Sequence, residues 1–199
     1  MEVTTLVGMY DSNTFITSTP KGTLIIDCGA DLENITKTLQ KHPKPWNLLL
    51  THGHIDHMLN AAPLQKLGAK VYIHTLDAER LTSDRDGDKY KQFGVEFCPE
   101  YTTFEDGDVL KLSGFSIEVI HTPGHTQGSV CFMIEGEMFA GDTLFFEDYG
   151  RTDLYGGNFE QMKASLHHLF TLDPDIKVYT GHYRTTTIGH EAKKNPIHF

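Results

Sequence analysis

The sequence has few cysteines and no long apolar run, and both shortages exclude classes of protein. Its three cysteines are an odd number, widely spaced and without a Cys-x-x-Cys pair. We therefore expect reduced thiols inside the protein and no disulfide framework. No stretch of the chain approaches the roughly 20 apolar residues of a membrane span. A membrane is accordingly not an expected partner.

Positive charge is also scarce. The 17 lysines and arginines are outnumbered by 27 aspartates and glutamates, which gives a net charge of −10. Nucleic acids and anionic lipids bind to concentrated positive charge, so we expect small-molecule substrates and no nucleic acid. Residues 1–5 lack the basic start and apolar run of a secretory signal, which predicts a cytoplasmic protein. Nothing in the sequence predicts an oligomeric state.

The order of the expected elements predicts an α/β fold. Short apolar runs that end in polar residues predict buried strands at 24–26, 48–50 and 71–73. Alternating segments predict hairpins, and a last strand follows them, at 109–112, 115–120, 129–134, 137–140 and 177–180. Apolar residues at helical spacing predict helices at 31–41, 60–67 and 159–170. Two mixed β-sheets packed together with helices outside, in a single domain spanning 1–199, accommodate this order.

Four potential metal ligands occur within six residues of the segment Thr51-His52-Gly53-His54-Ile55-Asp56-His57, directly after a predicted strand. His52 and His54 alternate on an extended segment and can face one metal ion. After the following bend, Asp56 and His57 can face a second ion. A polar loop with chance histidines is the alternative, but histidine fills only 12 of 199 positions. The cluster therefore predicts a metal site of imidazole and carboxylate donors.

Three further donors follow predicted strands and lie beside glycine. In His121-Thr122-Pro123-Gly124-His125, the Pro-Gly turn can return His125 over the strand end, whereas His121 is still on the strand. We therefore favour His125 as the ligand. Asp142 follows Gly141 and has two oxygens that can bridge two cations, and His182 follows Gly181. Each of these signals would be weak alone.

Together the donors predict a binuclear centre. His52, His54, His125 and Asp142 would bind one metal, and Asp56, His57, His182 and the same Asp142 would bind the other. Two divalent ions are expected, with zinc favoured and iron or manganese as alternatives. A water held between them loses a proton near neutral pH because the cations stabilise hydroxide. Hydrolysis by such a hydroxide, with Asp56 and Asp142 as catalytic carboxylates, is the expected chemistry.

Nearly the whole chain resembles the metallo-β-lactamase superfamily, in its glyoxalase II (hydroxyacylglutathione hydrolase) branch. The segments that carry the resemblance are Thr51 to His57, His121-Thr122-Pro123-Gly124-His125-Thr126-Gln127-Gly128-Ser129, Gly141-Asp142-Thr143-Leu144-Phe145 and Gly181-His182. The resemblance implies an αββα four-layer sandwich with the metals at the sheet edge, and the same division of ligands. It also implies a buried Asp27 beneath the site, which would orient a ligand imidazole. A turn-capping aspartate is the alternative for that residue.

The sequence predicts the identity of the substrate less precisely than the metal ligands. The resemblance favours hydrolysis of hydroxyacyl thioesters such as S-lactoylglutathione, whose thiolate leaves without a dedicated acid. The sequence stops soon after Gly181-His182, so we expect no C-terminal helical substrate domain. Where the glyoxalase II pattern has Lys and Tyr after Gly150, this chain has Arg151 and Asp153, and Tyr183 replaces a usual glycine. Arg151 would bind a substrate carboxylate or form an ion pair with Asp153.

Three alternatives stay open beside the thioesterase. The segment Gly150-Arg151-Thr152-Asp153 and the ending at 187–196 also resemble persulfide dioxygenases, which are iron enzymes with the same fold. Their iron would use His52, His125 and Asp142, all present in this chain. A β-lactamase is disfavoured because the amide nitrogen of a β-lactam is a poorer leaving group, and no separate motif that would stabilise or protonate it is evident. A non-catalytic metal-binding scaffold is disfavoured by the complete donor set.

Overall fold

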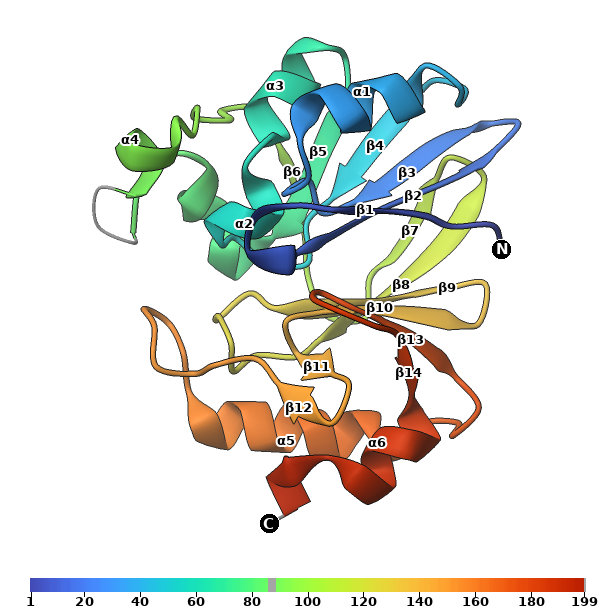
Figure 1. The fold of residues 1–199 in the computed structure, drawn as a ribbon, viewed down its shortest axis with the longest axis vertical. Coiled ribbons are helices and arrows are strands. Elements are labelled where there is room, and N and C mark those ends of the chain that lie inside the picture. Colours follow the sequence, from blue (N-terminus) through green and yellow to red (C-terminus); the bar gives the residue numbers. More distant parts are fainter. Residues whose placement is uncertain (86–88, 199) are drawn as a thin grey trace.

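Two six-stranded β-sheets pack face to face, and helices cover both outer faces (Figure 1). The computed structural model describes residues 1–85 and 89–198. The first sheet contains β1 (Thr4–Val7), β2 (Asn13–Thr19), β3 (Gly22–Ile26), β4 (Trp46–Leu49), β5 (Lys70–His74) and β6 (Thr102–Phe104), in that order. The second contains, in spatial order, β14 (Thr186–Thr187), β13 (Lys177–Thr180), β10 (Glu137–Gly141), β9 (Val130–Ile134), β8 (Phe115–His121) and β7 (Val109–Leu112).

The remaining elements surround these sheets. A small hairpin is formed by β11 (Leu144–Phe145) and β12 (Asp148–Tyr149). The α-helices are α1 (Leu32–Leu39), α2 (Ile55–Met58), α3 (Ala61–Lys66), α4 (Lys89–Phe93), α5 (Phe159–Leu169) and α6 (Ile188–Lys194). The 3-10 helices are η1 (Met9–Asp11), η2 (Thr75–Leu81) and η3 (Pro196–His198). Among the described residues, none of the helices is both long and apolar enough to cross a lipid bilayer.

Alternation along the strands sorts apolar side chains between three cores. On β3, Leu24 and Ile26 face the second sheet and pack with Phe132 and Phe139. Ile25 points to the other face of the same sheet and joins the core beneath α1 and α3. A third core lies between the second sheet and the helices α5 and α6. The period of two residues in a strand therefore produces four layers, as the αββα prediction requires.

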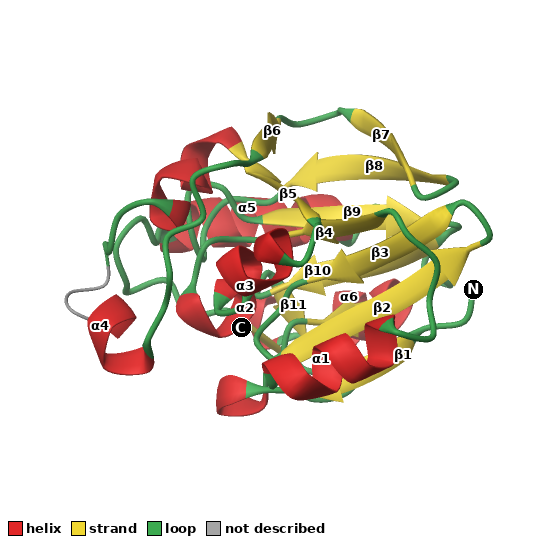
Figure 2. Ribbon diagram, turned by 90° about the horizontal axis from the view of Figure 1, so that it is seen from above, coloured by secondary structure: helices red, strands yellow, loops and turns green. Residues whose placement is uncertain are grey.

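The helices of the first half lie over the first sheet, as the view from above shows (Figure 2). Helix α1 begins where the Asp31 side chain accepts hydrogen bonds from the backbone N–H groups of Glu33 and Asn34. Its buried face presents Ile35 and Leu39 to the core. Helix α4 lies beyond the sheets at one end, beside the loops that carry the candidate ligands (Figures 1 and 2).

Parallel pairing places several loops at one edge. Strands β3, β4, β5 and β6 are mutually parallel, so their carboxyl ends lie at the same edge of the first sheet. In the second sheet, β10 and β13 are also parallel. The loops that follow β3, β4, β10 and β13 contain the predicted residues Asp27, His52, Asp142 and His182.

Candidate metal centre

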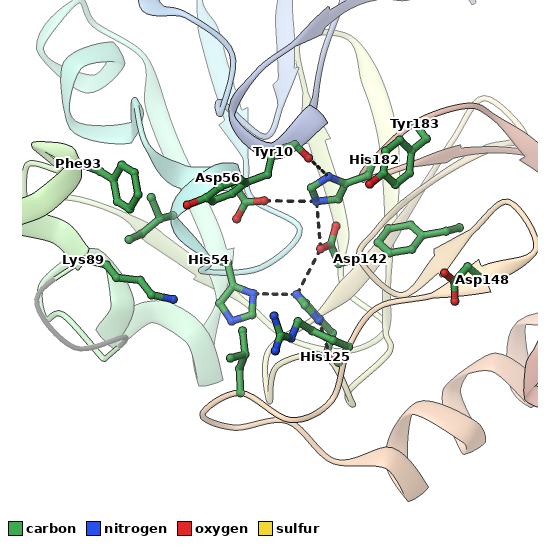
Figure 3. Close-up of a pocket in the computed structure, with 14 residues that line it drawn as sticks. Tyr10, His54, Asp56, Lys89, Phe93, His125, Asp142, Asp148, His182 and Tyr183 are labelled. Carbon is green, nitrogen blue, oxygen red and sulfur yellow. Dashed lines mark hydrogen bonds and ion pairs between the residues drawn. The ribbon is translucent and has the colours of Figure 1, made fainter.

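The seven predicted ligands come together in one cluster, although they derive from four separate segments. His52 and His54 lie between β4 and α2, whereas Asp56 and His57 lie in the first turn of α2. The other three follow strands of the second sheet: His125 after β8, Asp142 after β10 and His182 after β13. The cluster forms the floor of a pocket of about 550 Å³ at the edge of the sandwich (Figure 3). Both halves of the chain therefore contribute donors.

The donor atoms approach one another closely. Nδ1 of His54 lies 2.7 Å from Nε2 of His125, and Nε2 of His182 lies 3.3 Å from Oδ2 of Asp56. Ligands at 2.0–2.1 Å around a tetrahedral zinc ion stand roughly 3.3 Å apart. The His182–Asp56 separation matches that value, and the shorter His54–His125 separation is a direct hydrogen bond between two rings that face the same point.

The donors fall into two groups joined by a third. His52, His54 and His125 form one group, and Asp56, His57 and His182 form another, each with its ligand atoms within 4.8 Å of one another. The joining group consists of His52, His57 and Asp142. Asp142 reaches both sides, because its Oδ1 is 3.1 Å from Nε2 of His57 and its Oδ2 is 3.4 Å from Nε2 of His125.

Three buried atoms in the cluster lack hydrogen bonds. Nε2 of His52, Nε2 of His54 and Oδ1 of Asp142 have no hydrogen-bond partner in the described structure. Buried polar atoms without partners cost free energy and are rare in folded proteins. Imidazole nitrogens and carboxylate oxygens are donors that zinc, iron and manganese accept. The residues present therefore fit a pair of divalent cations.

Hydrogen bonds on the opposite ring nitrogen orient four of the five imidazoles. Nδ1 of His125 pairs with the carbonyl oxygen of Arg151 at 2.7 Å, and Nδ1 of His182 with that of Tyr10 at 2.9 Å. The other two pairs are His57 with Asp27 at 2.8 Å, and His52 with Thr51 at 3.1 Å. A carbonyl oxygen accepts only from a protonated Nδ1, so Nε2 is the nitrogen of His125 and of His182 that faces the cluster and would bind a cation in place of a proton.

Asp27 combines the two roles that the sequence left open. One oxygen accepts a hydrogen bond from the backbone N–H of Thr51, and the other pairs with the Thr51 hydroxyl and with Nδ1 of His57, all at 2.8 Å. Its backbone has φ of +57° at the end of β3. The carboxylate thus connects the turn after β3 to an imidazole of the cluster.

Asp77, which the sequence did not single out, connects two ligand loops. It is 1 % exposed and accepts hydrogen bonds from the backbone N–H groups of Gly53 at 2.8 Å and Gly128 at 2.9 Å. The hydroxyl of Thr126 donates a third bond at 2.7 Å. Asp77 follows β5 at the edge of the sheet that also carries the ligand loop after β4. Its position just after a predicted strand is the sequence feature by which it could have been identified.

The protonation states differ between the two groups. Burial lowers the pKa of His54, and burial together with the neighbouring His57 lowers that of His52. Burial opposes protonation of His57 and His182 too, but Asp142 raises the pKa of His57 and, by hydrogen bonding, that of His182 to about 9. Despite its burial, the pKa of Asp142 is lowered by the charge on His57. Protons on these imidazoles therefore balance the carboxylates, and cations would replace them.

Arg151 lines the pocket and also forms the predicted ion pair. Its guanidinium donates two hydrogen bonds to the carboxylate of Asp153, at 2.7 and 2.8 Å. Both side chains are largely exposed. His121 lies away from the cluster, where its Nε2 pairs with the carbonyl of Gln127 and its ring stacks on His74.

The fold and the donor cluster define a class of protein, and comparison with known families agrees. The model of the metallo-β-lactamase superfamily matches residues 7–182. The chain belongs to this superfamily, as the sequence predicted.

Individual relatives fall within the same class. Hydroxyacylglutathione hydrolase GloC of Haemophilus influenzae is 32% identical over 207 residues, which cover 99% of this chain and 97% of that protein. Among solved structures, the BLEG-1 B3 metallo-β-lactamase has a TM-score of 0.88 at 29% identity and covers 98% of both chains. TTHA1623 in a di-iron-bound form has a TM-score of 0.83 at 34% identity, covering 98% of this chain and 99% of that one. The chain is thus a member of a metallo-hydrolase superfamily.

Proposed function

We propose that this protein hydrolyses hydroxyacyl thioesters of the S-lactoylglutathione type. The observation that carries the proposal is the pair of donor groups joined by Asp142 at the floor of an open pocket. Similarity to GloC, a hydroxyacylglutathione hydrolase, over nearly the full length of both chains supports the choice of substrate class. The pocket also has cationic side chains, Lys89 and Arg151, for a substrate carboxylate.

We assign two divalent ions to the cluster. His52, His54, His125 and Asp142 would hold one, and Asp56, His57, His182 and Asp142 the other. Zinc is the expected metal, and the di-iron form of TTHA1623 supports iron as the alternative. When bound, the ions lower the pKa of a water molecule and polarise a carbonyl group.

In the proposed reaction, water adds to the thioester carbonyl carbon and the carbon–sulfur bond breaks. The products are the hydroxy acid and the free thiol. Asp56 would orient the attacking water and accept its hydrogen bond, because its pKa is lowered by His57 against the effect of burial and it stays ionised. The sulfur leaves as a thiolate with an ordinary pKa of about 8.5, so no protein acid is required.

One experiment separates this function from its rivals. The purified, metal-analysed protein is mixed with S-lactoylglutathione and, separately, with glutathione persulfide under oxygen. Thiol release from the thioester without oxygen uptake supports the proposal. Oxygen consumption with one bound iron would identify a persulfide dioxygenase. Inactivity toward both, with metals bound, would contradict the thioesterase and favour a scaffold.

A further inference from the structure

Three aromatic side chains form a wall on one side of the pocket. The aromatic wall consists of Tyr10 from η1, Phe93 from the end of α4, and Tyr183, which follows His182. Figure 3 shows all three on the side of the pocket where Asp56 and His182 lie. Tyr10 and Phe93 meet edge to face, with ring centroids 6.3 Å apart. Segments far apart in the sequence thus bring aromatic rings to the lining of one pocket.

Stability of the fold does not account for the two tyrosines. Tyr10 is 65 % exposed and Tyr183 is 70 % exposed. Both have left-handed backbone conformations, with φ of +54° and +61°, which favour glycine and disfavour a tyrosine. Each ring is therefore held at the pocket mouth at a conformational cost and with little burial. Such strain is typical of residues that serve a site.

Hydrogen bonds hold the backbone of both tyrosines beside the donor group of Asp56, His57 and His182. The carbonyl oxygen of Tyr10 accepts a hydrogen bond from Nδ1 of His182 at 2.9 Å. The carbonyl oxygen of Tyr183 accepts one from the side-chain amide of Asn13 at 3.1 Å. These hydrogen bonds fix the backbone from which the two rings extend, and a preorganised binding surface requires such a fixed backbone.

The other side of the pocket is cationic. Figure 3 shows Lys89 extending toward His54, away from the two tyrosines. Its ammonium makes no hydrogen bond or ion pair with the residues that the structure describes. Arg151 lies near the same group of donors, because its carbonyl oxygen binds His125. The two tyrosines and the Lys89 ammonium therefore lie on different sides of the donor cluster, although Lys89 and Phe93 belong to the same helix, α4.

We propose that the aromatic wall binds the acyl arm of the substrate, and that this arm carries a flat apolar ring. The cationic side would then hold carboxylates of the thiol arm, with the thioester carbonyl over the donor cluster. The inference rests on the proposed thioesterase function and narrows its substrate class to aromatic 2-hydroxyacyl thioesters. Aromatic side chains favour ring ligands because edge-to-face contacts add to the burial of apolar area.

A matched pair of substrates tests the wall. S-mandeloylglutathione differs from S-lactoylglutathione only by a phenyl ring in place of the methyl group. We expect the wild-type protein to have the higher kcat/KM for the mandeloyl thioester. Phe93→Leu and Tyr183→Gly should each lower that value about 10-fold and change the lactoyl value less than about 2-fold. Metal content should be unchanged.

Controls separate the wall from a general effect on the fold. Tyr101→Leu removes a surface ring that does not line the pocket, and both activities should be retained. If both wall variants lower the two activities equally, or neither variant alters the selectivity, the inference is wrong.

A binding measurement covers the case in which neither thioester is cleaved. The affinities of mandelate and lactate for the metal-loaded protein are then compared by calorimetry. A mandelate preference that Phe93→Leu and Tyr183→Gly abolish would support the wall while the thioesterase proposal fails. Equal binding of the two acids would overturn the wall as well.

Discussion

Asp142 is placed to connect the two donor groups, because its two oxygens face imidazoles of both. Asp142→Asn replaces one of these oxygens with an amide that cannot bridge cations. We expect the variant to lose bound metal from both groups and to lose activity by about 100-fold or more. Plasma mass spectrometry of the purified protein and a thiol-release assay measure the two effects. Asp148→Asn, at a pocket carboxylate outside the cluster, should retain both metals; full metal content in Asp142→Asn would refute the bridging role.

Asp77 supports the site without belonging to the donor cluster. Asp77→Asn would place an amide against one of three donors, Gly53 N–H, Gly128 N–H or the Thr126 hydroxyl. We expect a loss of about 1–3 kcal/mol in the free energy of unfolding and a metal affinity about 10- to 100-fold weaker. Denaturant titration and competition with a chelator give the two values. If the variant is destabilised but its metal affinity is unchanged, Asp77 stabilises the fold and does not contribute to metal binding.

Arg151 contributes to the site through two different groups. Its guanidinium lines the pocket, whereas its carbonyl oxygen orients His125. Arg151→Ala keeps the carbonyl, so we expect KM for the thioester to rise about 10-fold while kcat changes little. The matched variant Asp153→Ala frees the guanidinium and should not raise KM. A fall in kcat at constant KM would assign Arg151 to the chemistry instead of substrate binding.

The side-chain donors could be predicted from the sequence, but the backbone groups that orient them by hydrogen bonds could not. His52 to His57 stands out because imidazole and carboxylate groups are concentrated in a short segment after a strand. The carbonyl oxygens of Tyr10 and Arg151, which orient His182 and His125, have no sequence signal because every residue carries a carbonyl. Their roles depend on loops that meet only in the folded chain.

At the scale of elements, the turn before His125 packs directly on α5. Gly124 has φ of +142°, and a Cβ added there would overlap the backbone of Met162 in that helix. Its carbonyl accepts a hydrogen bond from the N–H of Asn158, the N-cap of α5. The helix therefore fixes the turn that presents the ligand.

Gly124→Ala should disturb the turn and the metal site together. We expect the free energy of unfolding to fall by about 3 kcal/mol, because the added methyl group meets backbone and the φ angle disfavours alanine. Circular dichroism during urea unfolding and metal analysis measure the effects. Gly136→Ala is the matched control: its φ is +78°, but no atom lies within 4 Å of an added Cβ. Equal effects of the two changes would exclude packing on α5 as the cause.

The helices and strands predicted for the second half agree with the structure to within about two residues, whereas β14 and α6 in that half, and β1, β2 and β6 of the first sheet, were not predicted. Strand β2 is rich in threonine and contains buried polar groups. These groups are satisfied by distant partners: the Asn13 amide donates to the carbonyl of Thr180, and the Thr17 hydroxyl to that of Glu2. A hydropathy pattern cannot reveal such a strand, because its burial depends on tertiary hydrogen bonds.

At the scale of the whole molecule, the donor cluster links two halves of the sandwich. Asp56 and His57 come from the segment after the first sheet's β4, whereas His125, Asp142 and His182 follow strands of the second sheet. Bound cations would therefore hold the halves together as well as serve the reaction. The layer order could be predicted from alternating strands and helices, and the approach of these loops from the pattern of donors after strands together with the family resemblance.

Removal of the metals should destabilise the whole protein. A ligand at 1,000 times its Kd stabilises a fold by about 4 kcal/mol, and 1 kcal/mol corresponds to roughly 2–4 °C in a domain of this size. We expect chelation to lower Tm by about 10 °C and zinc to restore it. Calorimetry with and without EDTA makes the measurement. An unchanged Tm after verified metal loss would show that the halves are held by the apolar core between the sheets.

The two carbonyl groups that orient His125 and His182 have a consequence for evolution. They belong to Arg151 and Tyr10, whose side chains line the pocket. Replacing either side chain retains the carbonyl, so substrate preference can change by mutation while the ligand orientation is inherited intact. Libraries randomised at positions 10 and 151 should therefore yield many metal-competent variants with new substrate preferences.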